Sequence, residues 1–63
     1  MTTQSQDEPV AVVDGPHGKA EIFEIMTPNR TMEYHVRFQG QTEVYKNLGE
    51  AYITAGQKAG VKT

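Results

Sequence analysis

Apolar and polar residues alternate without a break between Thr31 and Gln39. The apolar positions are Met32, Tyr34, Val36 and Phe38, and the polar positions between them are Glu33, His35, Arg37 and Gln39. A period of two places the four apolar side chains on one face of a strand and the polar ones on the other. We therefore predict a half-buried strand over this segment, with one face directed to a hydrophobic core.

Three further segments have the apolar, β-branched or aromatic content of short strands. They are Val10 to Val13, Lys19 to Met26 and Gln41 to Tyr45. Residues typical of tight turns separate them: a Gly-Pro-His-Gly run at 15–18, a Pro-Asn pair at 28–29 and a glycine at position 40. We predict three or four antiparallel strands, the last two of which form a hairpin.

Apolar residues follow a helical spacing in the C-terminal segment. These residues are Leu48, Ala51, Tyr52, Ala55 and Ala59, which share one face of a helix. Asn47 precedes the pattern as a suitable N-cap, and Glu50 stands three residues later, as in a capping box. Gly60 supplies a stop signal after the last apolar position. The spacing predicts a helix over 48–59.

Strands followed by one helix indicate an α+β fold, with a small antiparallel sheet of three to four strands and one C-terminal helix packed on one face. The expected core consists of Val12, Ile22, Met32, Tyr34, Val36, Phe38, Val44, Leu48, Ala51, Tyr52 and Ala55. Residues 1–8 offer no apolar side chain after Met1 and end in Asp7 and Glu8. We expect them to form a disordered acidic tail, and residues 9–63 to form a single β-β-β-(β)-α domain.

Composition narrows the class of protein. A chain of 63 residues holds one domain at most, and its lack of cysteine fits a reducing cytoplasm. No segment resembles a signal peptide or reaches the roughly 20 apolar residues of a membrane helix. The net charge is −2: residues 1–14 hold three acidic residues and no basic one, whereas the remainder holds six basic residues against five glutamates. A nearly neutral body argues against a strong nonspecific nucleic-acid binder.

Candidate catalytic groups are few. The only histidines are His17, in a predicted turn, and His35, on the polar face of a predicted strand. No Ser-His-Asp or Cys-His arrangement accompanies them. The run Gly15 to Lys19 shares glycines and a lysine with phosphate-binding loops, but it is too short and leads into a strand instead of a helix. We expect no enzyme, and no catalytic, cofactor or metal site.

The segment Lys19 to Met26 carries apolar residues on both of its faces. Ala20, Ile22 and Met26 form one face, and Phe23 and Ile25 lie on the other. A single helix covers only one side of a sheet, so Phe23, Ile25 and Tyr45 are candidates for a partner-binding or dimer surface on the uncovered face. Two alternatives stand beside this interpretation. The first strand or the tail folds over these residues, or the sheet curls into a partial barrel.

Three strands followed by a helix that begins near Leu48-Gly49-Glu50-Ala51 resemble the arm-type DNA-binding domains of phage integrases. The resemblance covers residues 31–59 and implies an open sheet face that enters a DNA groove. On this chain it would assign nucleic-acid contacts to His35, Arg37 and Tyr45. The sequence departs from the basic, aromatic face of that family at Glu33 and Glu43, which would repel phosphates.

The function expected from the sequence is therefore a small non-enzymatic interaction module or accessory protein in the cytoplasm. Its partner would be another protein or a second copy of itself, bound through the uncovered sheet face or a strand edge. No membrane contact is expected. The alternative is a weak, sheet-based nucleic-acid-binding module of the integrase type, a partner class that the charge pattern disfavours.

Overall fold

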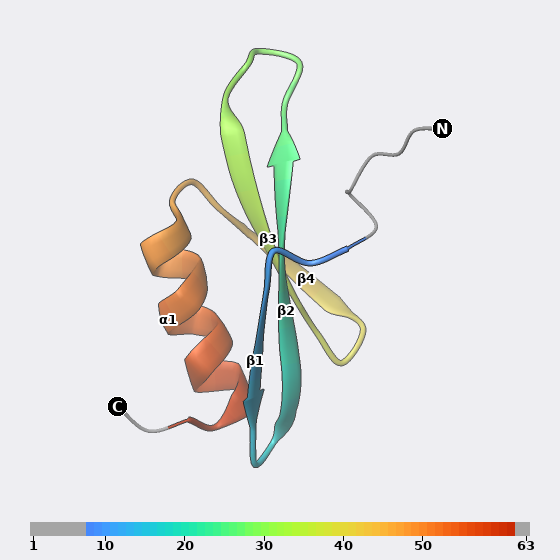
Figure 1. The fold of residues 1–63 in the computed structure, drawn as a ribbon, viewed down its shortest axis with the longest axis vertical. Coiled ribbons are helices and arrows are strands. Elements are labelled where there is room, and N and C mark those ends of the chain that lie inside the picture. The colour runs from blue at the N-terminus through green and yellow to red at the C-terminus, as the bar shows by residue number, and fades with distance from the viewer. Residues whose placement is uncertain (1–7, 62–63) are drawn as a thin grey trace.

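The computed structural model describes residues 8–61 and consists of a four-stranded antiparallel sheet and one α-helix (Figure 1). The elements are β1 (Ala11–Gly15), β2 (Gly18–Met26), β3 (Met32–Phe38), β4 (Gln41–Tyr45) and α1 (Leu48–Ala59). The predicted α+β class, with antiparallel strands followed by a C-terminal helix, is confirmed. The strand order is β1-β2-β3-β4, so the sheet is an open meander.

Short connections join the neighbouring strands. Gln39 and Gly40 separate β3 from β4 and have left-handed φ angles of 53° and 82°. Two successive left-handed residues form the turn whose twist matches that of a hairpin. Between β2 and β3, the N–H of Arg30 donates to the carbonyl of Thr27 at 3.0 Å, which closes the predicted β-turn.

The helix begins and ends at the residues that the pattern indicates. The side-chain oxygen of Asn47 accepts a hydrogen bond from the backbone N–H of Glu50 at 2.8 Å. Asn47 thereby satisfies one of the N–H groups that have no partner inside the first turn. Gly60 ends the helix in the left-handed conformation, with φ 86°, and its N–H reaches the carbonyls of Gln57 and Gly56.

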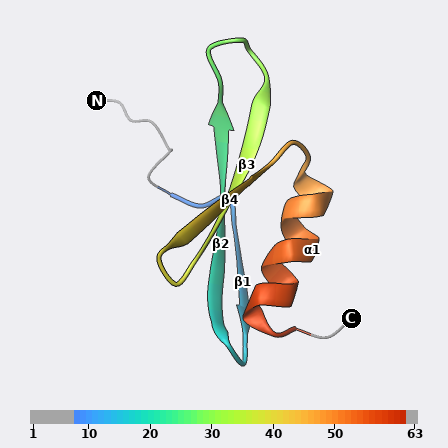
Figure 2. The same ribbon diagram turned by 180° about the vertical axis from the view of Figure 1, so that it is seen from behind.

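The core lies between α1 and one face of the sheet (Figures 1 and 2). Its buried side chains are Ala20, Ile22, Val36, Ala51, Ala55 and Ala59. Half-buried around them are Ala11, Val13, Tyr34, Phe38 and Tyr45. The helix contributes only alanines to the buried centre, so its backbone can lie close to the sheet. The core is consequently thin, and large apolar side chains occupy its margins.

The expectation that Val12 and Val44 belong to the core is wrong. Both point away from α1 and are 50% and 53% exposed. In an antiparallel pair, directly opposite residues share a face. Val12 lies opposite Glu21 and Val44 lies opposite His35, so both valines share the polar face of the two central strands.

Leu48 and Tyr52 are also not in the core, because they are 38% and 46% exposed. Ala51, Ala55 and Ala59 form the line of the helix that contacts the sheet. Tyr52 follows Ala51 and is turned about 100° away from that line. Leu48 is the first residue of α1 and so lies at the N-terminal end of the helix. The β2–β3 hairpin continues beyond this end (Figures 1 and 2).

Within residues 8–61, no helix has the length and apolar character needed to cross a membrane. The tail predicted over residues 1–8 lies outside the described residues except for Glu8, which is exposed.

Candidate interaction surface

The face of the sheet away from α1 is covered by no other helix or strand of the described chain (Figures 1 and 2). We call it the open face. Register places these side chains on it: Val12, Asp14, Lys19, Glu21, Phe23, Ile25, Glu33, His35, Arg37, Thr42 and Val44. Two of the alternatives for Phe23 and Ile25 are thereby tested, whereas the folding of the tail over them concerns residues outside the described chain. The first strand pairs with the edge of β2 instead of folding over them, and the described strands form an open sheet instead of a barrel.

Phe23 and Ile25 lie side by side on β2, near the centre of the open face. Phe23 pairs with His35 and Ile25 with Glu33, and these neighbours leave both apolar side chains only half-buried. A shallow hollow of about 300 Å³ lies here, lined by Phe23, Ile25, His35, Arg37, Gly40 and Thr42. The structure therefore brings the predicted partner-binding residues Phe23 and Ile25 together with His35 and Arg37.

Two valines that sequence reasoning assigned to the core lie on the same face of the sheet as Phe23 and Ile25. Val12 on β1 and Val44 on β4 belong to the open face and are half exposed. We call Val12, Phe23, Ile25 and Val44 the open-face patch. A signal for Val44 was present in the sequence: a two-residue turn at Gln39-Gly40 pairs Phe38 with Gln41, and counting on from there places Val44 opposite His35.

The prediction that Tyr45 contributes to the uncovered face is wrong. Tyr45 pairs with Tyr34 and packs against the core on the helix side of the sheet. Its hydroxyl donates a hydrogen bond to Glu43 Oε1, and Glu43 Oε2 lies 3.0 Å from Lys58 Nζ. The hydrogen bond from Tyr45 and the ammonium of Lys58 lower the pKa of Glu43. Tyr45 therefore helps to join β4 to α1 and is removed from both candidate binding surfaces.

His35 and Arg37 lie on the open face, as the nucleic-acid alternative requires, but acidic side chains surround them. His35 Nε2 is 3.2 Å from Glu33 Oε1, and Arg37 lies opposite Glu21. The described residues contain no group of three His, Cys, Asp or Glu side chains that could hold a metal ion. Acidic and basic side chains therefore both border the open-face patch.

His17 and the glycine-rich turn have a structural role in the fold. The backbone N–H of His17 donates to the carbonyl of Ala59 in the last turn of α1, at 2.8 Å. The turn therefore faces the C-terminal end of a helix, which carries partial negative charge. The partial negative charge of this helix end would repel the negative charge of a phosphate group.

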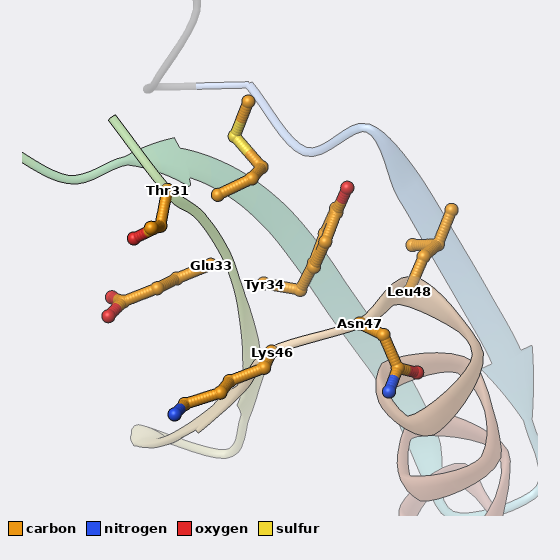
Figure 3. Close-up of a pocket in the computed structure, with 7 residues that line it drawn as sticks. Thr31, Glu33, Tyr34, Lys46, Asn47 and Leu48 are labelled. Atoms are coloured by element: carbon orange, nitrogen blue, oxygen red, sulfur yellow. The ribbon is translucent and has the colours of Figure 1, made fainter. Parts of the chain in front are cut away.

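A second hollow, of about 500 Å³, lies beside β3 where β4 ends and the chain turns into α1 (Figure 3). Its lining consists of Thr31, Met32, Glu33, Tyr34, Lys46, Asn47 and Leu48. Glu33 and Lys46 point to one side of β3, and Tyr34 and Leu48 lie on the other (Figure 3). The hollow thus spans the edge of the sheet and belongs to neither face alone.

Most polar groups around this second hollow already have partners. The hydroxyl of Tyr34 donates to Glu24 at 3.2 Å, and partial burial together with this neighbouring carboxylate raises the pKa of Tyr34. The Thr31 hydroxyl is bonded to Thr27, and Asn47 caps the helix. Few groups are left to orient a small molecule, so the open face is the better candidate.

Comparison of this chain with models of protein families, with curated proteins and with solved structures finds no match.

Proposed function

We propose that this protein is a small non-enzymatic interaction module that binds another protein chain through its open face. The observation that carries the proposal is the open-face patch: Phe23 and Ile25 are neighbours on β2, Val12 and Val44 lie on the same face of β1 and β4, and no helix or strand of the described chain covers them. Full burial of a side chain of this size contributes about 1.5–3 kcal/mol relative to exposure. A domain whose buried core holds only six small or medium-sized side chains gains substantially from covering such a patch.

The polar contacts of the domain support binding over catalysis. The side chains that commonly carry acid–base chemistry are held in local pairs: His35 with Glu33, and Tyr45 with Glu43. Neither pair is enclosed in a cavity that excludes water, which catalysis by such groups generally needs. The location we propose is the cytoplasm, which the absence of cysteine fits.

The arrangement of the open face indicates what kind of partner surface fits it. Protein interfaces of ordinary composition have an apolar centre and a polar rim. On the open face, Phe23 and Ile25 are central, and Glu21, Glu33 and Arg37 lie beside them. The matching surface is therefore a nearly flat protein surface with an apolar centre and charges of both signs at its margin.

Charging the centre of the open face tests the proposal. The variant Phe23→Glu with Ile25→Lys should remain folded, because neither side chain contributes to the buried core. We expect it to lose association with other protein chains. The measurement is photo-crosslinking of the full chain in an extract of its native cell, with a photoreactive phenylalanine analogue at position 23. Crosslinking to a protein, its own copy included, should be suppressed by an excess of unlabelled parent chain and not by the charged variant.

Ile53 provides the matched control, since it is 63% exposed on the outer side of α1. The same analogue at position 53 should give no product that the parent chain suppresses. Unfolding of the charged variant would place Phe23 and Ile25 in the structural core. Absence of specific crosslinking from position 23, together with a strictly monomeric parent, would overturn the proposed function.

A further inference from the structure

We propose that the outer edge of β4 binds an extended segment of a partner protein, which pairs with the backbone of Thr42 and Val44 as a fifth, antiparallel strand. Such a site goes beyond the proposed function, because it uses backbone groups at the edge of the sheet and not side chains at the centre of the open face.

The register shows which backbone groups of β4 point outward. In an antiparallel pair, opposite residues alternate between pairs that exchange both backbone hydrogen bonds and pairs that exchange none. Phe38 and Gln41 flank the two-residue left-handed turn, so they form a bonded pair. Counting on by two residues, Glu43 is also bonded to β3. Thr42 and Val44, between and beyond these positions, direct their N–H and C=O groups away from β3.

These four outward groups have no partner in the part of the chain that the structure describes. β4 has β3 as its one neighbour in the sheet, and no other hydrogen bond among residues 8–61 reaches the backbone of Thr42 or Val44. Four of the five β4 residues are exposed. A row of free N–H and C=O groups is a template for another extended chain, whose own backbone carries the matching groups at the same spacing.

The other outer strand, β1, has features that prevent edge pairing. The N–H of Val10 donates to the carbonyl of Ile22 at 2.7 Å, although Ala11 is the residue opposite Ile22. Two residues thus share one partner, as in a β-bulge. Pro9 precedes this bulge and Pro16 follows the strand, and proline has no N–H to donate. Bulges and prolines are devices by which proteins protect their edge strands.

β4 lacks these devices. Its pairing with β3 is continuous from Gln41 to Tyr45, and this segment contains no proline. Its one charged side chain is that of Glu43, which lies on the helix side in contact with Lys58 and Tyr45. An approaching strand therefore meets an uninterrupted row of backbone groups and no charge of β4 on the open face. The comparison of the two edges selects β4 as the binding edge.

The side chains of β4 indicate the chemistry of the bound segment. Directly opposite residues share a face, so the residues opposite Thr42 and Val44 lie on the open face, where Val44 is 53% exposed. β-Branched apolar residues pack well beside such a valine. The residue between them lies opposite Glu43, where a basic side chain is favourable and an acidic one is repelled. The expected segment thus has two β-branched apolar residues separated by a lysine or an arginine.

A second copy of this edge does not fit that description. The symmetric pairing that uses all four outward groups joins Thr42 to Val44 of the second copy and places the two Glu43 residues directly opposite each other. Like charges at opposite positions are destabilising. The occupant is therefore a segment of a different chain. A contact limited to one five-residue strand is smaller than a standard interface. We expect a dissociation constant of about 1 mM, in the weak, transient class.

Titration of the full chain with a synthetic peptide, acetyl-Thr-Val-Lys-Val-Thr-amide, tests the site by backbone NMR. The amide signals of Thr42 and Val44 should shift, and those of Val12 and Asp14 on β1 should not. In the proposed pairing the valine N–H groups point to β4 and the lysine N–H points away. N-methylation of the first valine should therefore abolish binding, whereas N-methylation of the lysine should leave it unchanged. Replacing the lysine by glutamate should weaken binding severalfold.

Two variants of the protein test the edge from the other side. Val44→Pro removes an outward N–H without removing a hydrogen bond to β3, and it should lose peptide binding. Val12→Pro makes the equivalent change on β1 and should retain binding. The two N-methylated peptides decide between the outcomes even where a proline variant does not fold, because they are measured on the parent chain.

Three results would overturn the inference: no shift of Thr42 and Val44 at about 10 mM peptide, tenfold above the expected dissociation constant; equal binding of the two N-methylated peptides; or shifts confined to β1. The variant Phe23→Glu with Ile25→Lys separates this site from the proposed function. It should still bind the peptide, and loss of binding would place the peptide on the open face instead of the edge. If the peptide fails to bind while position 23 crosslinks to a protein, the edge site is excluded and the proposed function stands.

Discussion

At the scale of single residues, Gly15 determines how closely the sheet and the helix approach each other. A Cβ atom added at Gly15 would lie 2.4 Å from the carbonyl oxygen of Ala59 and 2.9 Å from a methyl group of Val61. The hydrogen bond from His17 to Ala59 lies in the same place. The β1–β2 turn and the end of α1 are thus in direct backbone contact, which only a residue without a side chain allows.

Replacing Gly15 by alanine should force the turn and the helix apart. We expect Gly15→Ala to lower the free energy of unfolding by about 1–3 kcal/mol, the range for an added methyl group in a filled site. Urea denaturation followed by circular dichroism measures the change. Gly56→Ala is the control, because its Cβ meets nothing within 4 Å, and it should stabilise the helix by up to about 1 kcal/mol. Equal stability of Gly15→Ala and the parent would contradict the contact.

At the scale of elements, an ion pair supported by a tyrosine joins the edge strand β4 to α1. Glu43 on β4 accepts a hydrogen bond from Tyr45 and pairs with Lys58 in the last turn of the helix. Lys58 also lies where a positive charge is favourable for the helix dipole. The contact connects an edge strand to a helix that packs mainly against β2 and β3.

This contact makes stability depend on pH. The pKa of Glu43 is lowered in the folded state, chiefly by the hydrogen bond from Tyr45. The ionised carboxylate therefore stabilises the fold above its unfolded pKa, and the contribution is lost as the pH falls through the folded pKa. We expect Glu43→Gln to lower the melting temperature at pH 7 and to lose less stability on acidification than the parent. Tyr45→Phe should show an intermediate pH dependence. If the melting temperatures of the parent and of Glu43→Gln changed with pH in parallel, this role of Glu43 would be refuted.

At the scale of the whole molecule, charge distribution separates protein binding from nucleic-acid binding. The chain carries a net charge of −2. The open face carries two basic side chains, Lys19 and Arg37, and three acidic ones, Asp14, Glu21 and Glu33. A surface that follows a phosphate backbone needs a basic excess, which these side chains do not provide.

We accordingly expect no binding to duplex DNA or single-stranded RNA tighter than weak micromolar at physiological salt. Fluorescence anisotropy with labelled oligonucleotides, at low and physiological salt, measures it. Binding through phosphates weakens steeply as salt increases. Submicromolar binding that falls with salt and disappears in Arg37→Glu would favour the nucleic-acid alternative over the proposed function.

The elements of this protein were predictable from the sequence because local interactions specify them. The alternation over Thr31 to Gln39, the Pro28-Asn29 turn and the Asn47 cap each act within a few residues of chain. The period of two along β2 placed Phe23 and Ile25 on the face opposite that of Ile22, so half of the open-face patch was also predictable. The first and last residues predicted for each strand and for the helix agree with the observed ones to within two residues.

The sequence by itself thus determined three or four antiparallel strands, their turns and one helix, because hydrogen bonds and side-chain alternation along the chain decide them. Only the tertiary structure decided which face the first strand turns to the helix and how the helix docks on the sheet. A shift of one residue in pairing exchanges the two faces of a strand, and it is the pairing of Val12 with Glu21 that puts Val12 on the open face. Docking of α1 through Ala51, Ala55 and Ala59 likewise left Leu48 and Tyr52 at the margin. Such choices depend on contacts between segments distant in sequence, which no local pattern contains.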